Sequence, residues 1–542
     1  MVKKLLNHSS KTIFSAAVIL AVMALTSRIL GLFRDRLLAG RFGAGDALDA
    51  YFAAFRLPDL IYSILVMGAI SSAFIPVFAH YWQKDKNEAW HLTSGILNLI
   101  SLGLIFLAII FIFFAPWLIS FIAPGFSGEK RETTILLTRI MFLSPIFLGI
   151  SSILSGFLQY FNRFFVSSLA PIMYNVGIIL GIIFFVPSFG LVGLAWGVVL
   201  GAFLHLLIQV PSAIFSGFRW KGIFTFYHEG IKKIIKLTIP RTVGLAGTQI
   251  NFWIITAIAS TLASGSIAIF NLSNNLQYVP IGIIGISFAT ASFPKLAKSF
   301  VDKDKENFAR SFFSTFNQIL FWVLPISVGF FLLRAQVVRI ILGTGQFGWV
   351  DTRLTAAALG IFSFSIFAQS LIPLVSRAFY SFHDTKTPVL ISLVSIVANI
   401  IFSFFFVWLL KQGNLFSLFV SNSLKLGGLM DISVLGLAVA FSLSSLLNFF
   451  VLIRFFSKKV DFWRQRNILD SLVKNILSCI IMAVVIYAML NITSLFLNTH
   501  TFVGIFFQAL ISAVFGAIIY FLSSLIFKSE EAHTLVKKIF KK

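Results

Sequence analysis

The chain has 542 residues, of which 58% are apolar and only 11% are charged, and its formal net charge is +24. Soluble domains carry about 45–50% apolar and about 25% charged residues, so this composition excludes an ordinary water-soluble fold. Apolar runs long enough to cross about 30 Å of hydrocarbon recur from end to end. Because these runs are apolar on every face, we expect membrane-spanning helices and not a β-barrel.

About 14 spans are predicted in chain order. Basic residues gather in the loops on one side of this topology, chiefly in 219–236, 295–310, 454–474 and 537–542. By the positive-inside rule both termini are cytoplasmic, and the basic loops contact anionic phospholipids, so nucleic-acid binding is not indicated. The predicted spans cover residues 12–38, 47–80, 92–117, 134–160, 166–187, 190–216, 236–262, 266–297, 307–333, 352–381, 387–410, 431–456, 468–491 and 502–527.

The sequence contains an internal repeat. The stretch 73–76 (AFIP) beside the second span is echoed by 291–294 (ASFP) beside the eighth, and 190–196 (GLVGLAW) is echoed by 433–439 (SVLGLAV). Spans 1–6 therefore correspond to spans 7–12. Since six is an even number, both halves enter the membrane in the same orientation, as in transporters with parallel repeats.

The repeat predicts four parts of the chain. An N-terminal six-helix lobe covers 1–216, a basic cytoplasmic linker covers 217–235, and a second six-helix lobe covers 236–456. Residues 457–542 form an appended pair, spans 13 and 14, with a basic cytoplasmic tail.

Glycines at four-residue intervals predict close helix packing in the first lobe. Gly193, Gly197 and Gly201 follow one another in the sixth span, and Gly177 and Gly181 do so in the fifth. Small residues at this spacing let membrane helices approach closely. We assign these glycines to packing and not to a site.

Ionisable residues inside the first two spans are the main functional signal. A charge near the middle of a bilayer costs about 2.5–3.5 kcal/mol on insertion scales, so such side chains must face a wet interior or one another. Arg28 and Asp35 are seven residues apart and share a helix face. Arg34 lies on another face, within reach of Asp49 from the second span. For Asp49 and Arg56, binding in a cavity and structural ion pairing both stay open.

The excess of arginine over acid in these spans predicts an anionic cargo, because guanidinium groups bind phosphate in bidentate fashion. The second half offers mostly amides, among them Asn275. We therefore expect Arg28 and Arg34, in the first half, to bind the charged headgroup of an amphiphile.

Several stretches together resemble the MurJ (MviN) family of proposed lipid II flippases. They are spread from the first to the eleventh predicted span, and their combination carries the resemblance. The stretches are 27–35 (SRILGLFRD), 42–45 (FGAG), 49–52 (DAYF), 55–58 (FRLP), 73–78 (AFIPVF), 123–126 (APGF), 162–164 (NRF), 262–266 (LASGS) and 386–388 (KTP).

The resemblance implies the fold of the multidrug/oligosaccharidyl-lipid/polysaccharide exporters. In that fold two six-helix lobes form a V around a cationic cavity, and the final helix pair forms a groove for a polyprenyl tail. The implied activity is alternating-access transfer of lipid II, or a similar undecaprenyl-diphosphate-linked saccharide, to the outer leaflet of the bacterial cytoplasmic (inner) membrane. Cell-wall synthesis or division proteins are the partners that it suggests. Arg28, Arg34 and Asp49 match positions that matter in the family.

The chain departs from the family pattern at three places. Residues 61–63 (IYS) stand where the family usually has an arginine, and 66–69 (VMGA) stand where it often has AEGA. In 274–280 (NNLQYVP), Asn275 and Tyr278 replace an arginine and an acidic residue. These differences keep an alternative open: the same fold would export another polyprenyl-linked oligosaccharide or an amphiphilic drug.

Enzymatic activity is not indicated. The outer loops hold only scattered acids such as Glu129, Glu132, Asp351 and Asp431, without the paired carboxylates or activated nucleophile that catalysis needs and without a metal-binding cluster. No nucleotide-binding glycine loop is present and no cofactor is expected, so a membrane potential or an ion gradient would drive transport. A scaffold for envelope proteins is a third class, and it would need no charged cavity.

Overall fold

The computed structural model describes residues 13–64, 73–223, 227–460 and 466–540, and every regular element in these ranges is a helix. The divergent stretch 66–69 lies outside the described residues. By their internal contacts the residues fall into two units, Met1–Ala268 and Ile269–Lys542. The all-helical architecture agrees with the composition.

Within the described ranges, ten helices are long and apolar enough to span a membrane, or eleven if α18 (Trp349–Ser363) and α19 (Ile366–Ser381), bent by 46°, form one span. The first two predicted spans are not among them. The first span, α2 (Ile13–Phe42), contains Arg28, Arg34, Asp35 and two further arginines. The second is broken into short helices. The total of 14 stays a prediction.

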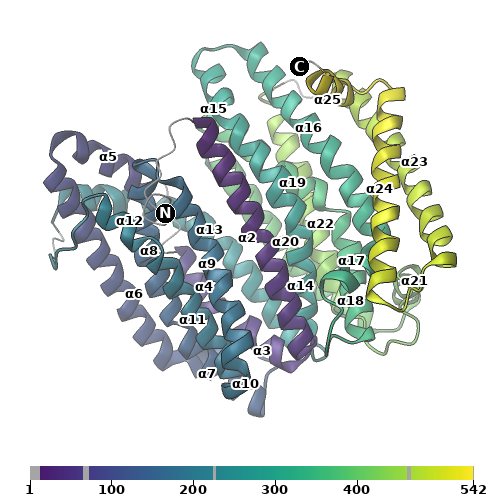
Figure 1. The fold of residues 1–542 in the computed structure, drawn as a ribbon, viewed down its shortest axis with the longest axis horizontal. Helices are drawn as coiled ribbons and strands as arrows, with labels where there is room; N and C mark the ends of the chain where they lie inside the picture. The colour runs from purple at the N-terminus through teal and green to yellow at the C-terminus, as the bar shows by residue number, and fades with distance from the viewer. Residues whose placement is uncertain (1–12, 65–72, 224–226, 461–465, 541–542) are drawn as a thin grey trace. The chain divides into compact units, whose positions relative to one another are not determined.

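Unit 1 is built around a core of aromatic side chains. Phe78 and Phe157 are fully buried, and the indole of Trp90 packs edge-on against Phe157 at 5.3 Å. Asp85 accepts a hydrogen bond from the Asn87 N–H at 2.8 Å, which caps the long helix α6. The elements that begin in this unit (Figure 1) are α2, α3 (Asp46–Ala54), α4 (Arg56–Tyr62), α5 (Ile75–Lys84), α6 (Lys86–Ile122), α7 (Gly128–Met141), α8 (Leu143–Tyr160), α9 (Phe164–Leu180), the π-helical turn η3 (Gly181–Phe185), α10 (Val186–Phe189), α11 (Leu191–Leu207), α12 (Val210–Phe215), α13 (Glu229–Ser260) and α14 (Ser266–Pro280).

The predicted glycine contact joins α9 and α11. A Cβ atom on Gly177 would lie 2.2 Å from the Gly201 Cα, and one on Gly181 would lie 2.3 Å from the Gly197 Cα. No side chain fits between backbones at these distances, so the two helices depend on glycine at each contact. The packing role expected for these residues is confirmed.

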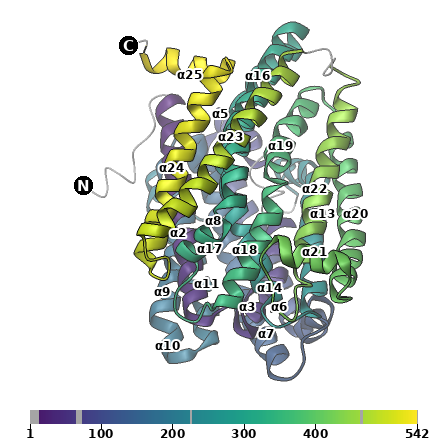
Figure 2. The ribbon, with the colours of Figure 1, turned by 90° about the vertical axis from the view of Figure 1, so that its right-hand side faces the viewer.

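Unit 2 has its own aromatic core and carries the last two spans. The rings of Phe312 and Phe456 lie 4.5 Å apart in the core. The Tyr520 hydroxyl of α24 donates to the Phe321 carbonyl of α16 at 2.8 Å, so the last spans are fastened to this unit (Figure 2). After α14 its elements are η4 (Ile281–Ile286), α15 (Ser287–Val301), α16 (Lys305–Leu332), α17 (Arg334–Ile341), α18, α19, α20 (Lys386–Lys411), α21 (Leu415–Ser423), α22 (Leu435–Phe456), α23 (Arg466–Phe496), α24 (Phe502–Ile526) and α25 (Glu530–Phe540).

One pair of residues that the repeat aligns has the same environment in both units. A Cβ atom on Gly193 would lie 2.4 Å from the Phe185 backbone, and one on Gly436 would lie 2.6 Å from the Val407 backbone. In each unit this glycine brings a helix against the span before it. The boundary between the units, however, follows Ala268, so α13 groups with unit 1, whereas the repeat starts the second lobe at 236. The four-part division by sequence stays a prediction.

Candidate functional site

Arg34 lies inside α2 and is held by two side chains. Its Nε and Nη2 donate to Asp35 Oδ1 at 3.1 and 2.8 Å, and its Nη1 donates to Asn175 Oδ1 at 3.1 Å. The Asn175 amide in turn donates to the Ser27 carbonyl at 3.4 Å. The Arg34 side chain is 21% exposed and Asp35 is buried. The guanidinium is therefore oriented while part of it stays accessible.

The expected meeting of Arg34 and Asp49 is wrong. The acid beside Arg34 in the chain, Asp35, occupies one edge of the guanidinium, and Asp49 pairs with Lys130 instead. Asp49 thus does not orient an arginine. Asp35 is the next residue in the chain, so its contact with the Arg34 guanidinium does not depend on how distant helices are arranged.

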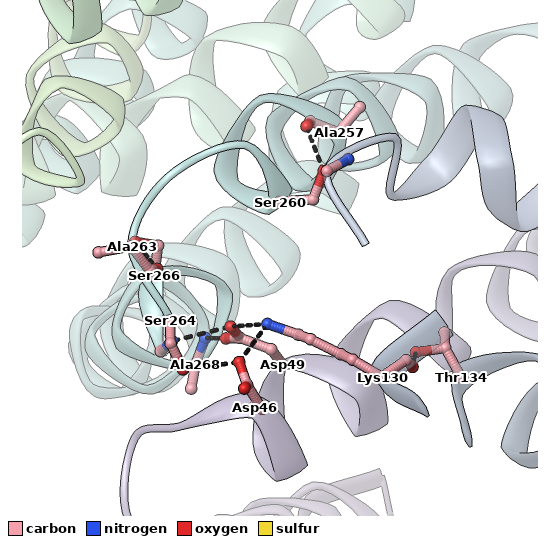
Figure 3. A network of polar contacts seen from close by, with 12 residues as sticks. Asp46, Asp49, Lys130, Thr134, Ala257, Ser260, Ala263, Ser264, Ser266 and Ala268 are labelled. Atoms are coloured by element: carbon pink, nitrogen blue, oxygen red, sulfur yellow. Dashed lines mark hydrogen bonds and ion pairs between the residues drawn. The ribbon is translucent and has the colours of Figure 1, made fainter. Parts of the chain in front are cut away.

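The Asp49 cluster, comprising Asp46, Asp49, Lys130, Ser264, Gly265 and Ala268, joins three segments of unit 1 (Figure 3). The Lys130 Nζ of α7 lies 2.9 Å from Asp49 Oδ2 and 2.6 Å from Asp46 Oδ1, both on α3. Asp49 also accepts from the Gly265 N–H at 2.8 Å and from the Ala268 N–H at 2.9 Å. Asp49 is only 2% exposed, so these hydrogen bonds replace the water that its carboxylate loses.

Two of these bonds lie at the start of α14. The first N–H groups of a helix have no partner within the helix, and a carboxylate there also interacts favourably with the helix dipole. Asp49 therefore caps α14 from a distant part of the chain. The backbone before α14 requires glycine, because Gly265 has a φ of +87° and a Cβ atom there would lie 1.9 Å from the Ala44 carbonyl oxygen.

The Asp49 cluster also affects the pKa of Asp46, which lies at its exposed edge. Hydrogen bonds from Lys130 and then from the Ser264 hydroxyl lower the pKa of Asp46 below its ordinary value. Asp46 is 63% exposed, so solvent screens this pair strongly. The Lys130 ammonium also lies 4.2 Å from the centre of the Phe126 ring. Most of the cluster's strength therefore comes from buried Asp49.

Arg56 makes contacts that join two helices. Its Nε donates to the Thr256 hydroxyl at 2.8 Å, and its guanidinium carbon lies 5.4 Å from the centre of the Phe252 ring. Both partners belong to α13. The bonds tie α4 to α13 within unit 1.

The other two predicted site residues differ in exposure. Arg28 lies on α2 and is exposed, whereas Asn275 lies on α14 and is half-buried. Near Asn275, in unit 2, the Gln277 amide donates to Asn274 Oδ1 at 2.9 Å and accepts from the Gln369 amide at 3.1 Å. This part of unit 2 holds neutral amides, as the sequence indicates.

Sequence reasoning missed Lys130, Asn175 and Thr256, which hold Asp49, Arg34 and Arg56. Lys130 follows the APGF landmark by four residues, which was the one available signal. Among the residues that the structure describes, no group of three or more His, Cys, Asp or Glu side chains is arranged to hold a metal ion.

Comparison with known proteins adds the family. The family profile described as lipid II flippase MurJ matches residues 38–508. This chain belongs to the MurJ family. It is 30% identical over 510 residues to a probable lipid II flippase MurJ of Buchnera aphidicola subsp. Acyrthosiphon pisum, covering 91% of this chain and 94% of the relative. It is also 30% identical to the probable lipid II flippase MurJ of Vibrio cholerae, covering 82% and 83%.

Solved structures agree with the MurJ assignment. A lipid II flippase MurJ in an inward closed conformation matches with a TM-score of 0.75 at 26% identity, over 96% of this chain and all of that chain (100%). An inward-facing multidrug resistance MATE family transporter of the MOP superfamily matches with a TM-score of 0.64 at 15% identity, over 82% and 98%, which supports the fold alone. The chain is a multi-pass membrane transporter, as its spans and its family indicate.

Proposed function

We propose that this protein is a lipid II flippase that works by alternating access and that Arg34 binds the diphosphate of its cargo. The observation that carries this proposal is the arrangement of Arg34 in a member of the MurJ family. A guanidinium has five N–H donors, and hydrogen bonds to Asp35 and Asn175 use three of them. The remaining donors suit a phosphate oxygen, and Asp35 and Asn175 fix the direction in which they point.

Arg28, which is exposed on the same helix α2, is the second cation for the headgroup in this proposal. Asp49 and Arg56 have structural roles. The Asp49 cluster holds α3, α7 and the start of α14 together. Its ion pairs can break and re-form during a transport cycle without any covalent bond being made or broken. Lys130 is therefore the residue whose loss would disturb the cycle at this point.

Membrane location, energy source and partners complete this proposal. The protein lies in the bacterial cytoplasmic membrane with both termini cytoplasmic, and its basic loops contact anionic phospholipids. It moves lipid II without catalysing a reaction or using a cofactor, and a membrane potential or an ion gradient supplies the energy. Cell-wall synthesis or division proteins are its partners.

The test uses bacterial cells depleted of their own lipid II flippase and expressing this chain. The measured quantity is the fraction of lipid II accessible from outside. We expect restored exposure, and we expect Arg34→Ala to abolish it while the protein stays inserted. Arg131→Ala is the matched control, because Arg131 pairs with exposed Glu132 near the start of α7. Failure of the wild-type chain to restore exposure would reject lipid II as the cargo.

Asn275 favours one second candidate, export of another polyprenyl-linked oligosaccharide or an amphiphilic drug. The family usually places an arginine where this chain has Asn275, so unit 2 offers an amide where a diphosphate would meet a charge. Asn275→Arg separates the candidates in the same cells. Higher lipid II exposure with Asn275→Arg than with the wild type supports another natural cargo, whereas equal or lower exposure supports lipid II.

A further inference from the structure

Unit 2 contains a cavity of about 720 Å³ that the proposed transport role does not use. It lies between the α14–η4–α15 span, α16 and the C-terminal helix α25. Helix α25 lies at the same end of unit 2 as the start of α16 (Figures 1 and 2). The volume is in the range of about 300–1,000 Å³ that is usual for small-molecule sites, so the cavity can hold a lipid headgroup and the upper part of its chains.

The lining has one polar and one apolar end. On α16 it runs from Arg310 to Phe321, eleven residues or about 16 Å along the helix, which is about half the thickness of the hydrocarbon core. Arg310 and the two acids of α25 lie at the end where α16 begins, while Phe321 and Trp322 lie deeper. The cavity therefore has the length and polarity of one leaflet.

Asn317 lies between these two ends of the cavity, and its side-chain oxygen is a hydrogen-bond acceptor that a ligand could use. It lines the cavity and is 8% exposed, and its Oδ1 has no hydrogen-bond partner among the described residues. A buried acceptor left without a donor is unfavourable by about 1–3 kcal/mol. A ligand that brings an N–H group would satisfy it.

The charges at the polar end select the kind of ligand. In a chain with 43 basic and 19 acidic residues, the cavity is lined by two carboxylates, Glu530 and Glu531, and one cation, Arg310. Glu531 accepts from the Ser471 and Ser529 hydroxyls, whereas Glu530 is exposed and makes no ion pair within the described part of the chain. Arg310 pairs with exposed Glu306, an ion pair of small strength that a phosphate can replace. The acidic excess disfavours an anionic lipid and favours an ammonium group.

We propose that this cavity is a binding site for a zwitterionic phospholipid of the phosphatidylethanolamine class. The ammonium group is its only headgroup hydrogen-bond donor, and it faces Glu530, Glu531 and Asn317 Oδ1. The phosphate faces Arg310, and the acyl chains lie along Phe321 and Trp322. Arg310 is also the last residue of the basic stretch 295–310, which is predicted to contact anionic phospholipids. A diphosphate-linked cargo, with at least two negative charges, is excluded from this cavity by the same acids.

Trp322 gives a direct measurement. The full-length protein is reconstituted in phosphatidylglycerol vesicles containing a small fraction of phosphatidylethanolamine or phosphatidylglycerol with brominated acyl chains, which quench nearby tryptophan fluorescence. The signal of Trp322 is the difference between the wild type and Trp322→Phe. We expect brominated phosphatidylethanolamine to associate about five to ten times more strongly than brominated phosphatidylglycerol.

Two variants test the headgroup contacts. Asn317→Leu and Glu530→Gln should each reduce that preference about threefold, the low end for one hydrogen bond, so that the two losses together account for the whole preference. Glu530 is exposed, so Glu530→Gln removes no ion pair within the described part of the chain. Glu129→Gln, which removes an exposed acid from α7, should leave the preference unchanged. Equal quenching by both lipids, an unchanged preference in Glu530→Gln, or displacement of the brominated lipid by undecaprenyl diphosphate would overturn the proposal.

Discussion

The two units hold their buried polar groups in different ways. At the candidate site of unit 1 buried ions meet ions, with Asp35 beside Arg34 and Asp49 beside Lys130, although unit 1 also buries neutral pairs such as Gln209 and Ser151. In unit 2 the comparable polar groups around Gln277 are amides and hydroxyls. Both arrangements satisfy hydrogen bonds inside an apolar protein, but they differ in what happens when one partner is lost.

The difference teaches where single substitutions should matter most. A buried ion without its partner must be accommodated as an uncompensated charge, whereas a buried amide without its partner leaves only an unmade hydrogen bond. Unit 1 is therefore the more sensitive of the two, and its ions offer a switchable contact as well as a binding group. Single substitutions in each unit can test this ranking, beginning with the largest effect.

Lys130→Met should have the largest effect on stability. It leaves Asp49, which is 2% exposed, without a cation, and breaking a buried ion pair in this way is unfavourable by about 3–5 kcal/mol. Unfolding of the purified protein in mixed micelles measures the loss. Arg310→Met is the control and should change stability by no more than about 1 kcal/mol, because Arg310 and its partner Glu306 are both exposed. Equal effects of the two variants would contradict the assigned role of Asp49.

Gln277→Met should have a smaller effect. Gln277 is fully buried and joins Asn274 to Gln369, so its loss removes two hydrogen bonds, while Gln369 keeps its bond to the Ser365 hydroxyl. We expect a loss of about 1–3 kcal/mol in the same unfolding assay, below the loss for Lys130→Met. A larger loss than for Lys130→Met would reverse the comparison between the units.

Asn175→Leu should separate orientation from charge at Arg34. The variant removes the Nη1 acceptor and keeps the pair with Asp35. We expect lipid II exposure in complemented cells to fall about tenfold, because the guanidinium loses one of two contacts that direct it. Asn175→Asp keeps an acceptor but adds a negative charge that competes with a diphosphate, so it should also impair transport. Normal transport in both variants would show that Arg34 does not bind the headgroup.

Local patterns of the sequence predicted much of this structure. Apolar length predicted membrane helices, and four-residue spacing predicted close helix packing at Gly177 and Gly201, which the structure places against each other. A costly charge in an apolar span identified Arg34 and Asp49 as residues that need partners, whatever those partners are. Each of these inferences depends on a single helix or on its nearest neighbour.

The partners themselves could not be predicted, because they depend on which helices become neighbours in space. Lys130 is 81 residues from Asp49, and Asn175 is 141 residues from Arg34. The pairing of Arg34 with Asp49 was wrong for the complementary reason, since a contact at the next residue, Asp35, was available. Helical spacing restricts the face of a charge but does not select its partner.

The smallest predicted effect is a pH dependence at the start of α13. The ring nitrogen Nδ1 of His228 accepts a hydrogen bond from the Gly230 N–H at 3.1 Å, which caps the helix, and Nε2 lies 3.7 Å from Glu88. Burial lowers the pKa of His228, the Glu88 carboxylate partly offsets this, and His91 adds to the lowering, with Glu229 acting in the same direction as Glu88. Protonation at Nδ1 would remove the cap acceptor, so the folded protein prefers the neutral ring.

Because the pKa of His228 in the folded protein lies below its ordinary value of 6.5, the unfolded chain takes up this proton first as the pH falls. The contribution of His228 is therefore complete above about pH 6.5 and is lost as the pH falls through the folded pKa. His228→Asn keeps a cap acceptor that does not titrate, and should flatten the pH dependence of unfolding between about pH 7.5 and pH 5. Identical pH profiles for the variant and the wild type would mean that the neutral ring is not what holds the start of α13.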